Sequence, residues 1–200
     1  MSLLTIRLFG DPVLRQQARE VDVFDDRLRR LADDMLQTMR AAPGVGLAAP
    51  QVGVLKRLFT FEFHGIDEEE EEEEDAGEHG AVANPVLVDA SDDAEEDDEG
   101  CLSFPGLFYP VERPLHVAIA WQDLDGEEHT RQLSSFEARV WLHEMDHLDG
   151  ILLIDHLARH DRKEAMKLMW QYREEHGVDM PGQGRMANLL LGGGPASGDS

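Results

Sequence analysis

Residues 143–150 read His-Glu-Met-Asp-His-Leu-Asp-Gly, a stretch with two histidines four residues apart and a glutamate directly after the first. Side chains four residues apart lie on one face of a helix, so His143 and His147 can bind the same metal ion. The carboxylate of Glu144 can then reach a water molecule activated at that ion. The alternative for so short a pattern is a solvent-facing helix that carries these residues by chance.

A third metal ligand is expected elsewhere in the chain, because catalytic sites generally use three protein ligands and leave one position open. Zinc proteases with a longer motif have a third histidine six residues after the second, but this chain has Leu153 there. The single cysteine, Cys101, is the best candidate, since flanking glycines and a proline fix its backbone. A buried structural cysteine is the alternative if Cys101 is considered alone.

Three helices are predicted from apolar spacing and end signals. Ser134 or Ser135 is the expected N-cap of the helix that carries the histidines, and Gly150 lies near its end. An amphipathic helix is predicted over residues 24–39 and a charged helix over residues 161–176.

Short strands are predicted at residues 57–63, 81–88 and 115–124. The turn-forming pair Asp125-Gly126 ends the last of these, and a partner strand is expected after it, so antiparallel pairing is favoured. Residues 44–51 are expected to form a small-residue loop, whose glycines allow close approach to a site.

The net charge of −24 is concentrated in one region. Residues 67–99 contain 18 of the 42 acidic residues and no lysine or arginine, so the remainder of the chain carries only −6. Residues 67–75 are expected to form a solvated loop or hairpin tip. The acidity argues weakly against nucleic-acid binding, and no apolar run approaches the roughly 20 residues that span a bilayer. A cytoplasmic protein without DNA or membrane partners is expected.

Three stretches together resemble the signature motifs of peptide deformylases, in order and spacing. They are residues 44–51 (GVGLAAPQ), 99–103 (EGCLS) and 143–150 (HEMDHLDG), and the resemblance extends from about Thr5 to Asp155. It implies an α+β fold, with antiparallel β-sheets packed around a central helix carrying the HExxH motif. It also implies one catalytic domain over residues 1–176, with acidic insertions at 67–80 and 89–99. Residues 177–200 are expected to be an extension that is disordered at its end.

By this resemblance, the protein removes the formyl group from the N-terminal formylmethionine of new bacterial polypeptides and releases formate. Glu144 would transfer the proton, and the Gln51 side-chain amide and the Leu102 backbone N–H would stabilise the oxyanion. Glu99 and Arg113 would form a supporting ion pair. The implied metal ligands are Cys101, His143 and His147.

The resemblance also implies how substrate binds. The backbone around Val45, Gly46 and Gly100 would pair with the extended peptide as an added strand. Phe136, Val140 and Leu102 are candidates for the methionine pocket by their position, although each could equally be ordinary core.

Fe(II) is the metal that the resemblance favours, with Zn, Ni or Co possible, because the ligand set does not discriminate among them. Formylated nascent peptides are the expected partners, and a transient ribosome contact is possible. Two positions depart from many family members: Leu142 replaces a glutamine and Phe108 replaces an arginine found in some, so substrate anchoring can differ.

Two other functions would use parts of the same residue pattern. A metallopeptidase that cleaves internal bonds would need a further downstream ligand, and none is convincing. A non-catalytic, metal-binding and ribosome-associated relative would not need Glu144 or Gln51, and both are present.

Overall fold

Five strands form an antiparallel sheet in the order β1-β2-β3-β6-β7. The computed structural model describes residues 2–63 and 78–177, so the acidic run 67–75 and the expected C-terminal tail lie outside the described residues. The strands of this sheet are β1 (Gly46–Ala48), β2 (Leu58–Glu62), β3 (His79–Ala90), β6 (His116–Gln122) and β7 (Glu128–Ser134). The three strands predicted at 57–63, 81–88 and 115–124 are therefore confirmed, and so is the partner strand after Asp125-Gly126.

A second sheet is a two-stranded antiparallel hairpin of β4 (Ala94–Cys101) and β5 (Phe104–Pro114). Neither strand was predicted, because β4 is a run of acidic residues, which are depleted in strands. Along β5 the exposure alternates, so that Val111 and Arg113 are buried while Phe108 is exposed. The acidic residues of β4 have weak strand propensity. Pairing with β5 and burial of one face of the hairpin outweigh that weakness.

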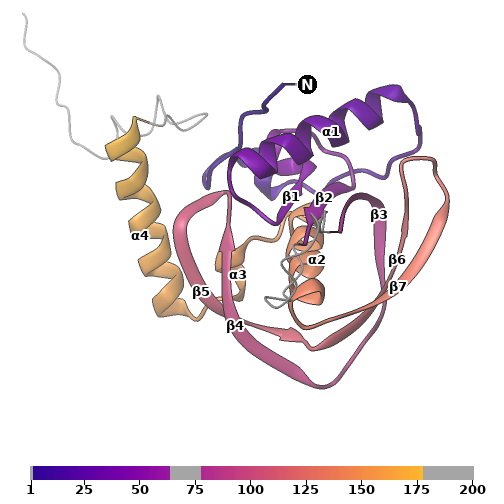
Figure 1. Ribbon diagram of the computed structural model, residues 1–200. Coiled ribbons are helices and arrows are strands. Elements are labelled where there is room, and N and C mark those ends of the chain that lie inside the picture. Colours follow the sequence, from indigo (N-terminus) through magenta and orange to yellow (C-terminus); the bar gives the residue numbers. More distant parts are fainter. Residues whose placement is uncertain (1, 64–77, 178–200) are drawn as a thin grey trace, which may run out of the picture.

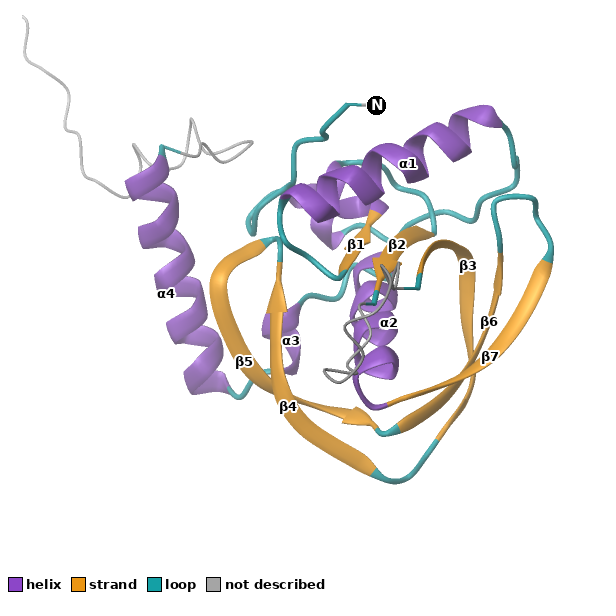
Figure 2. Cartoon of the chain, in the orientation of Figure 1, coloured by secondary structure: helices purple, strands orange, loops and turns teal. Residues whose placement is uncertain are grey.

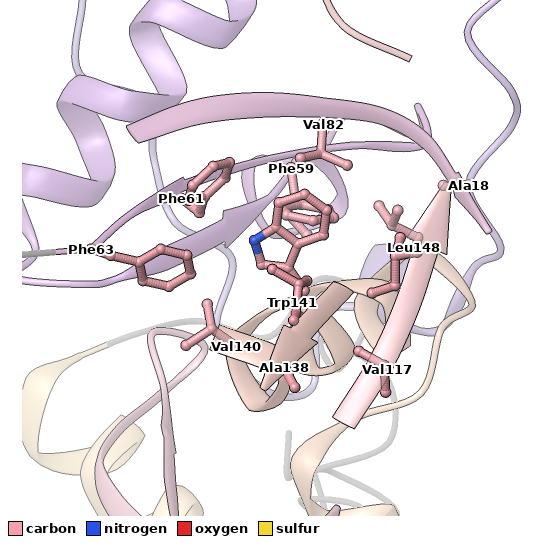
Figure 3. Packing of buried hydrophobic residues seen from close by; sticks show 13 residues of the cluster. Ala18, Phe59, Phe61, Phe63, Val82, Val117, Ala138, Val140, Trp141 and Leu148 are labelled. Carbon is pink, nitrogen blue, oxygen red and sulfur yellow. The ribbon is translucent and has the colours of Figure 1, made fainter. Parts of the chain in front are cut away.

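Helix α2 (Ser135–Leu148) lies between the two sheets (Figure 1). Ser134 is the N-cap by position, but its side chain makes no capping hydrogen bond. The indole of Trp141 packs edge-on against Phe59 and Trp121, with ring centroids 5.4 and 5.0 Å away. Figure 3 shows Trp141 among the buried apolar side chains around it, Phe59 included. This apolar contact fixes the rotation of the helix, and the opposite face of α2 carries the two histidines. The predicted central helix is confirmed.

Helix α1 (Asp26–Ala41) covers β1 and β2. Its N-cap is Asp25, whose carboxylate accepts hydrogen bonds from the backbone N–H groups of Arg27 and Leu28. The apolar face of the helix packs in a core cluster that includes Leu28, Met35, Met39, Leu47 and Leu58. Residues 46–48, predicted as part of a loop, form the edge strand β1, and a 3₁₀ helix (Ala49–Val52) follows.

Helices α3 (Leu153–His156) and α4 (Arg159–His176) follow α2, and α4 lies along the outside of β5 (Figure 2). The helix predicted over residues 161–176 is thus confirmed. Arg173 of α4 donates a hydrogen bond of 2.6 Å to the carbonyl of Phe9, which ties this helix to the N-terminal segment. Within residues 2–63 and 78–177, no helix combines the length and apolar character needed to cross a membrane.

Candidate active site

The three predicted metal ligands come together where the end of β4 meets α2. Cys101 is the last residue of β4, and His143 and His147 lie one turn apart on α2. The Cys101 Sγ lies 3.2 Å from His147 Nε2, and the ligand atoms of all three residues lie within 4.8 Å of one another. The two imidazole rings have centroids 5.0 Å apart. One ion can therefore contact a sulfur and two nitrogens at once.

The surroundings of Cys101 favour the thiolate. Burial raises the pKa of its thiol, but the charge on His147 and hydrogen bonds with both histidines outweigh burial and lower the pKa to about 5. A thiolate is the form of cysteine that binds metal ions. The sulfur is therefore ready to bind a metal ion at neutral pH.

A buried ionic network holds His143 in place. The Nδ1–H of His143 donates to Glu99 Oε2 over 2.9 Å, which leaves Nε2 for a ligand bond. Arg113 donates to both oxygens of Glu99, over 2.8 and 3.0 Å. Burial raises the pKa of Glu99, but His143 and Arg113 together lower it to about 2. The ion pair expected between Glu99 and Arg113 is present, and it holds His143, one of the three predicted metal ligands.

Arg139 extends this network and was missed from the sequence. Its guanidinium donates to Glu99 Oε1 over 3.0 Å and to the carbonyl of Val111 over 2.7 Å. It also donates to the carbonyls of Glu95 and Asp97 on β4. A single side chain of α2 thus attaches both strands of the hairpin to the helix. The available signal was its position four residues before His143, on the same helix face.

Two further residues of the network were also missed. Asp146 accepts a hydrogen bond of 2.7 Å from Arg113 and lies 2.7 Å from His156 Nε2. Burial raises the pKa of Asp146, but His156 and Arg113 lower it overall. Asp146 lies inside the HExxH motif, and its position on α2 was the signal for a contact with the hairpin. Nothing in the sequence indicated His156.

Glu144 is 3% exposed and faces β1. A Cβ atom on Gly46 would lie 2.3 Å from Glu144 Oε1, so the glycine makes room for this carboxylate. Burial raises the pKa of Glu144 to about 7, against the lowering effect of the two histidines. Its Oε2 is buried and has no hydrogen-bond partner among the described residues. Such an oxygen is available to a reactant that enters the site.

The side chain of Gln51 is held in one orientation. Its Oε1 accepts a hydrogen bond of 2.8 Å from the backbone N–H of Ala48. Its Nε2 therefore faces Ser103 Oγ at 3.2 Å and Cys101 Sγ at 3.6 Å. Leu102 lies beside Gly44, where a Cβ would approach Leu102 Cδ1 to 2.7 Å. Ser103, fully buried, is a further contact that the sequence did not indicate.

A cavity of about 710 Å³ opens beside these residues. Phe136 is half-exposed at its wall, whereas Val140 both lines the cavity and belongs to the core around Trp141. All of the predicted site residues except His147 line this cavity, and the Nε2 atom of His147 lies 3.2 Å from Cys101 Sγ. The lining residues predicted for the site are Val45, Gly46, Gln51, Gly100, Cys101, Leu102, Phe136, Val140, His143 and Glu144.

These residues fit a catalytic metal ion. One thiolate and two imidazoles form a three-ligand set, and the buried Glu144 carboxylate beside it is not needed as a ligand. The set suits Fe, Zn, Ni and Co alike.

The family model described as polypeptide deformylase matches residues 3–163. The chain belongs to the peptide deformylase family. A peptide deformylase from Parafrankia sp. is 46% identical over 167 residues, which cover 84% of this chain and 85% of that protein. One from Zymomonas mobilis is 43% identical over 175 residues, covering 87% of this chain and 97% of that protein.

Solved deformylase structures share the fold. The peptide deformylase from Ehrlichia chaffeensis has a TM-score of 0.81 and 33% identity, and the match covers 88% of this chain and 99% of that one. A crystal structure of the Ehrlichia chaffeensis enzyme in complex with actinonin has a TM-score of 0.78 and 36% identity, covering 88% and 98% of the two chains. The metal dependence of deformylases agrees with the ligand cluster of this chain.

Proposed function

We propose that Cys101, His143 and His147 hold the catalytic ion of this deformylase and that Glu144 transfers the proton. The protein is a metal-dependent hydrolase that removes the N-terminal formyl group from newly synthesised polypeptides. The observation that carries the proposed roles is the position of Glu144. It is a buried carboxylate on the cavity wall, beside the three-ligand cluster, with one oxygen that has no partner among the described residues.

A bound divalent ion supplies Lewis acidity, which lowers the pKa of water towards about 7 and polarises a carbonyl. Glu144 accepts the proton of the attacking water and later delivers it to the departing amine nitrogen. Because Gly46 has no side chain, the Glu144 carboxylate has room at the cavity wall, where it can face both the attacking water and the departing amine nitrogen. Formate and a free amino terminus are the products.

The negative charge on the formyl oxygen needs hydrogen-bond donors in fixed positions. The Gln51 amide is suited to this role because Ala48 holds its Oε1 and thereby directs Nε2 towards the ligand cluster. The backbone N–H of Leu102, next to Cys101, is the second donor. Donors that are already oriented stabilise such charge without reorganisation during the reaction.

The substrate peptide lies between two backbones. Val45 and Gly46 of one segment and Gly100 of β4 all line the cavity, so the formylated chain can pair with their backbones as an added strand. Phe136 and Val140 contact the methionine side chain. Backbone pairing binds many sequences, as an enzyme that acts on nascent chains requires.

We also propose that the ion in the cell is Fe(II) and that the protein is located in the cytoplasm. A transient ribosome contact brings the enzyme to formylated nascent peptides. One catalytic domain spans residues 1–176, with acidic insertions at 67–80 and 89–99 and a C-terminal extension at 177–200. The alternative of a non-catalytic relative is not favoured, because such a protein would not need Glu144 and Gln51.

The variant Glu144→Gln tests the proposed role. Loss of the proton acceptor should lower kcat for a formyl-Met peptide by a factor on the order of 10² to 10⁴, while the content of bound metal stays unchanged. Formate release by anaerobically purified protein is the measurement. The matched control is Glu137→Gln, on the same helix but outside the cavity lining, which should retain activity. Near-normal turnover by Glu144→Gln would eliminate the role of this carboxylate.

A further inference from the structure

A chain of hydrogen-bonded side chains connects the proposed metal site to the short helix α3. His156, the last residue of α3, has its Nε2 atom 2.7 Å from Asp146 Oδ2. The same oxygen of Asp146 accepts a hydrogen bond of 2.7 Å from Arg113. Arg113 also donates to Glu99, and Glu99 accepts from His143, so the chain ends on a proposed metal ligand. It passes through α3, α2, β5 and β4.

The two ends of this chain differ in their access to water. The side chains of Glu99 and Arg113 are 3% and 7% exposed, whereas those of Asp146 and His156 are 20% and 29% exposed. Water therefore competes with Arg113 for the carboxylate of Asp146, as it does for exposed ion pairs in general. The weak point of the chain is its outer end.

His156 limits this competition. Because an ionised carboxylate only accepts hydrogen bonds, the Nε2 atom of His156 donates its N–H to Asp146. Oδ2 of Asp146 thus has two donors from two elements, and the carboxylate cannot rotate towards water without losing both bonds. The guanidinium of Arg113 then keeps a carboxylate at each end, which fixes its plane against Glu99.

The imidazole is held in place because α3 itself is anchored. Asp155, directly before His156, accepts a hydrogen bond of 2.9 Å from the backbone N–H of Leu152 and pairs with Arg15. The helix also contacts β4 and β5. His156 lies outside the cavity lining, so it is placed to act on the network and not on the substrate.

We propose that His156 is a positioning residue of the metal centre, which acts through Asp146 and the ionic network on the orientation of His143. The partners of a metal-binding histidine fix its ring orientation and its tautomer, and these set how tightly the ion is held. The proposal rests on the ligand role of His143 proposed above. It extends the support of the ion from the buried network to a residue near the surface.

The test compares two amides of different reach. His156→Gln can place an N–H near the position of the imidazole Nε2, whereas the shorter side chain in His156→Asn leaves Asp146 to water. The matched control is His160→Asn, the same substitution at a histidine of α4 that is 88% exposed and pairs with Asp161. The proteins are loaded with Co(II). The measurements are the rate of Co(II) loss to a chelator, the visible absorption of bound Co(II), and kcat and KM for a formyl-Met peptide.

His156→Asn should lose Co(II) about three- to tenfold faster than the wild type, since direct partners of a ligand typically contribute about 10- to 100-fold. The Co(II) absorption should change, because it depends on ligand geometry. kcat should fall by a similar factor while KM stays the same, because the cavity lining is intact. His156→Gln should remain within about twofold of the wild type, and His160→Asn should match it.

A double-mutant cycle tests the path. If His156 acts only through Asp146, then adding His156→Asn to Asp146→Asn should change the rate of Co(II) loss by less than about twofold. Additive effects of the two substitutions would show that the path does not run through Asp146.

Two further results would overturn the inference. One is an unchanged rate of Co(II) loss in His156→Asn, even if its Tm falls, because His156 would then only stabilise α3. The other is an equal loss in His156→Gln and His156→Asn, because the donated hydrogen bond would then be irrelevant. A variant His143→Ala that holds Co(II) as tightly as the wild type would instead disprove the ligand role on which the inference rests.

Discussion

One backbone contact fixes the orientation of the Gln51 side-chain amide. Its oxygen is occupied by the backbone N–H of Ala48, so only Nε2 is free to face the ligand cluster. Gln51→Ala removes this donor and should lower kcat by about a hundredfold or more, with little change in bound metal. Single-turnover formate release measures the effect on the chemical step. A loss of less than threefold would mean that the amide does not contact the developing charge.

At the same scale, local spacing explains which site residues were predictable. His143 and His147 are set four apart by the helix repeat, and Cys101 was recognised through the motif around it. Arg139 was not predictable in the same way, because its partners besides Glu99 are carbonyl oxygens at residues 95, 97 and 111. Only the folded hairpin brings those atoms to α2.

At the scale of elements, the short helix α3 depends on Asp155. Its carboxylate accepts from the backbone N–H of Leu152 over 2.9 Å, pairs with Arg15, and lies 3.1 Å from Arg162. Burial raises the pKa of Asp155, but Arg15 and the Leu152 N–H lower it below its ordinary value of 3.8. The stability from the ionised carboxylate is thus fully present above pH 3.8 and is lost as the pH falls below that value.

Asp155→Asn should lower the free energy of unfolding by about 1 kcal/mol at pH 7, since the site is partly exposed. The difference from wild type should shrink below pH 3.8. Urea unfolding at pH 7 and at lower pH measures both effects. The control is Asp125→Asn, which removes an exposed ion pair with Arg29 and should change stability little. If the difference in free energy of unfolding between wild type and Asp155→Asn grew as the pH fell, the proposed contribution of the ionised Asp155 carboxylate would be wrong.

The elements differ in how well the sequence indicated them. Helices α1, α2 and α4 and strands β2, β3 and β6 follow from apolar periodicity or turn residues. Strands β4 and β5 do not, because the acidic residues of β4 resemble a solvated segment. Burial of Glu99 against Arg113 and Arg139 holds β4 in the fold, and this compensation is visible only once the partners are placed.

At the scale of the whole molecule, a bound metal ion should link the β4–β5 sheet to helix α2. Cys101 belongs to the β4–β5 sheet, while His143 and His147 belong to α2. An ion at 100 times its Kd stabilises the fold by about 2.7 kcal/mol. Removing it with a chelator should therefore lower Tm by about 5–10 °C for a chain of this size.

Calorimetry with and without chelator measures the shift. Glu144→Gln should keep it, because that carboxylate is not a ligand, whereas Cys101→Ser should lose most of it. An equal shift in Cys101→Ser and in the wild type would remove the sulfur from the ligand set.

The packing around Trp141 gives α2 an optical reporter. The indole is 1% exposed and stands edge-on to Phe59 and Trp121. Trp141 lies two residues before His143 on α2. An indole in such apolar surroundings fluoresces at shorter wavelength than one in water. Trp170, partly exposed on α4, and Trp121, only partly buried on β6, contribute at longer wavelength. The blue edge of the emission therefore follows the packing of α2 as the ion leaves, without an attached dye.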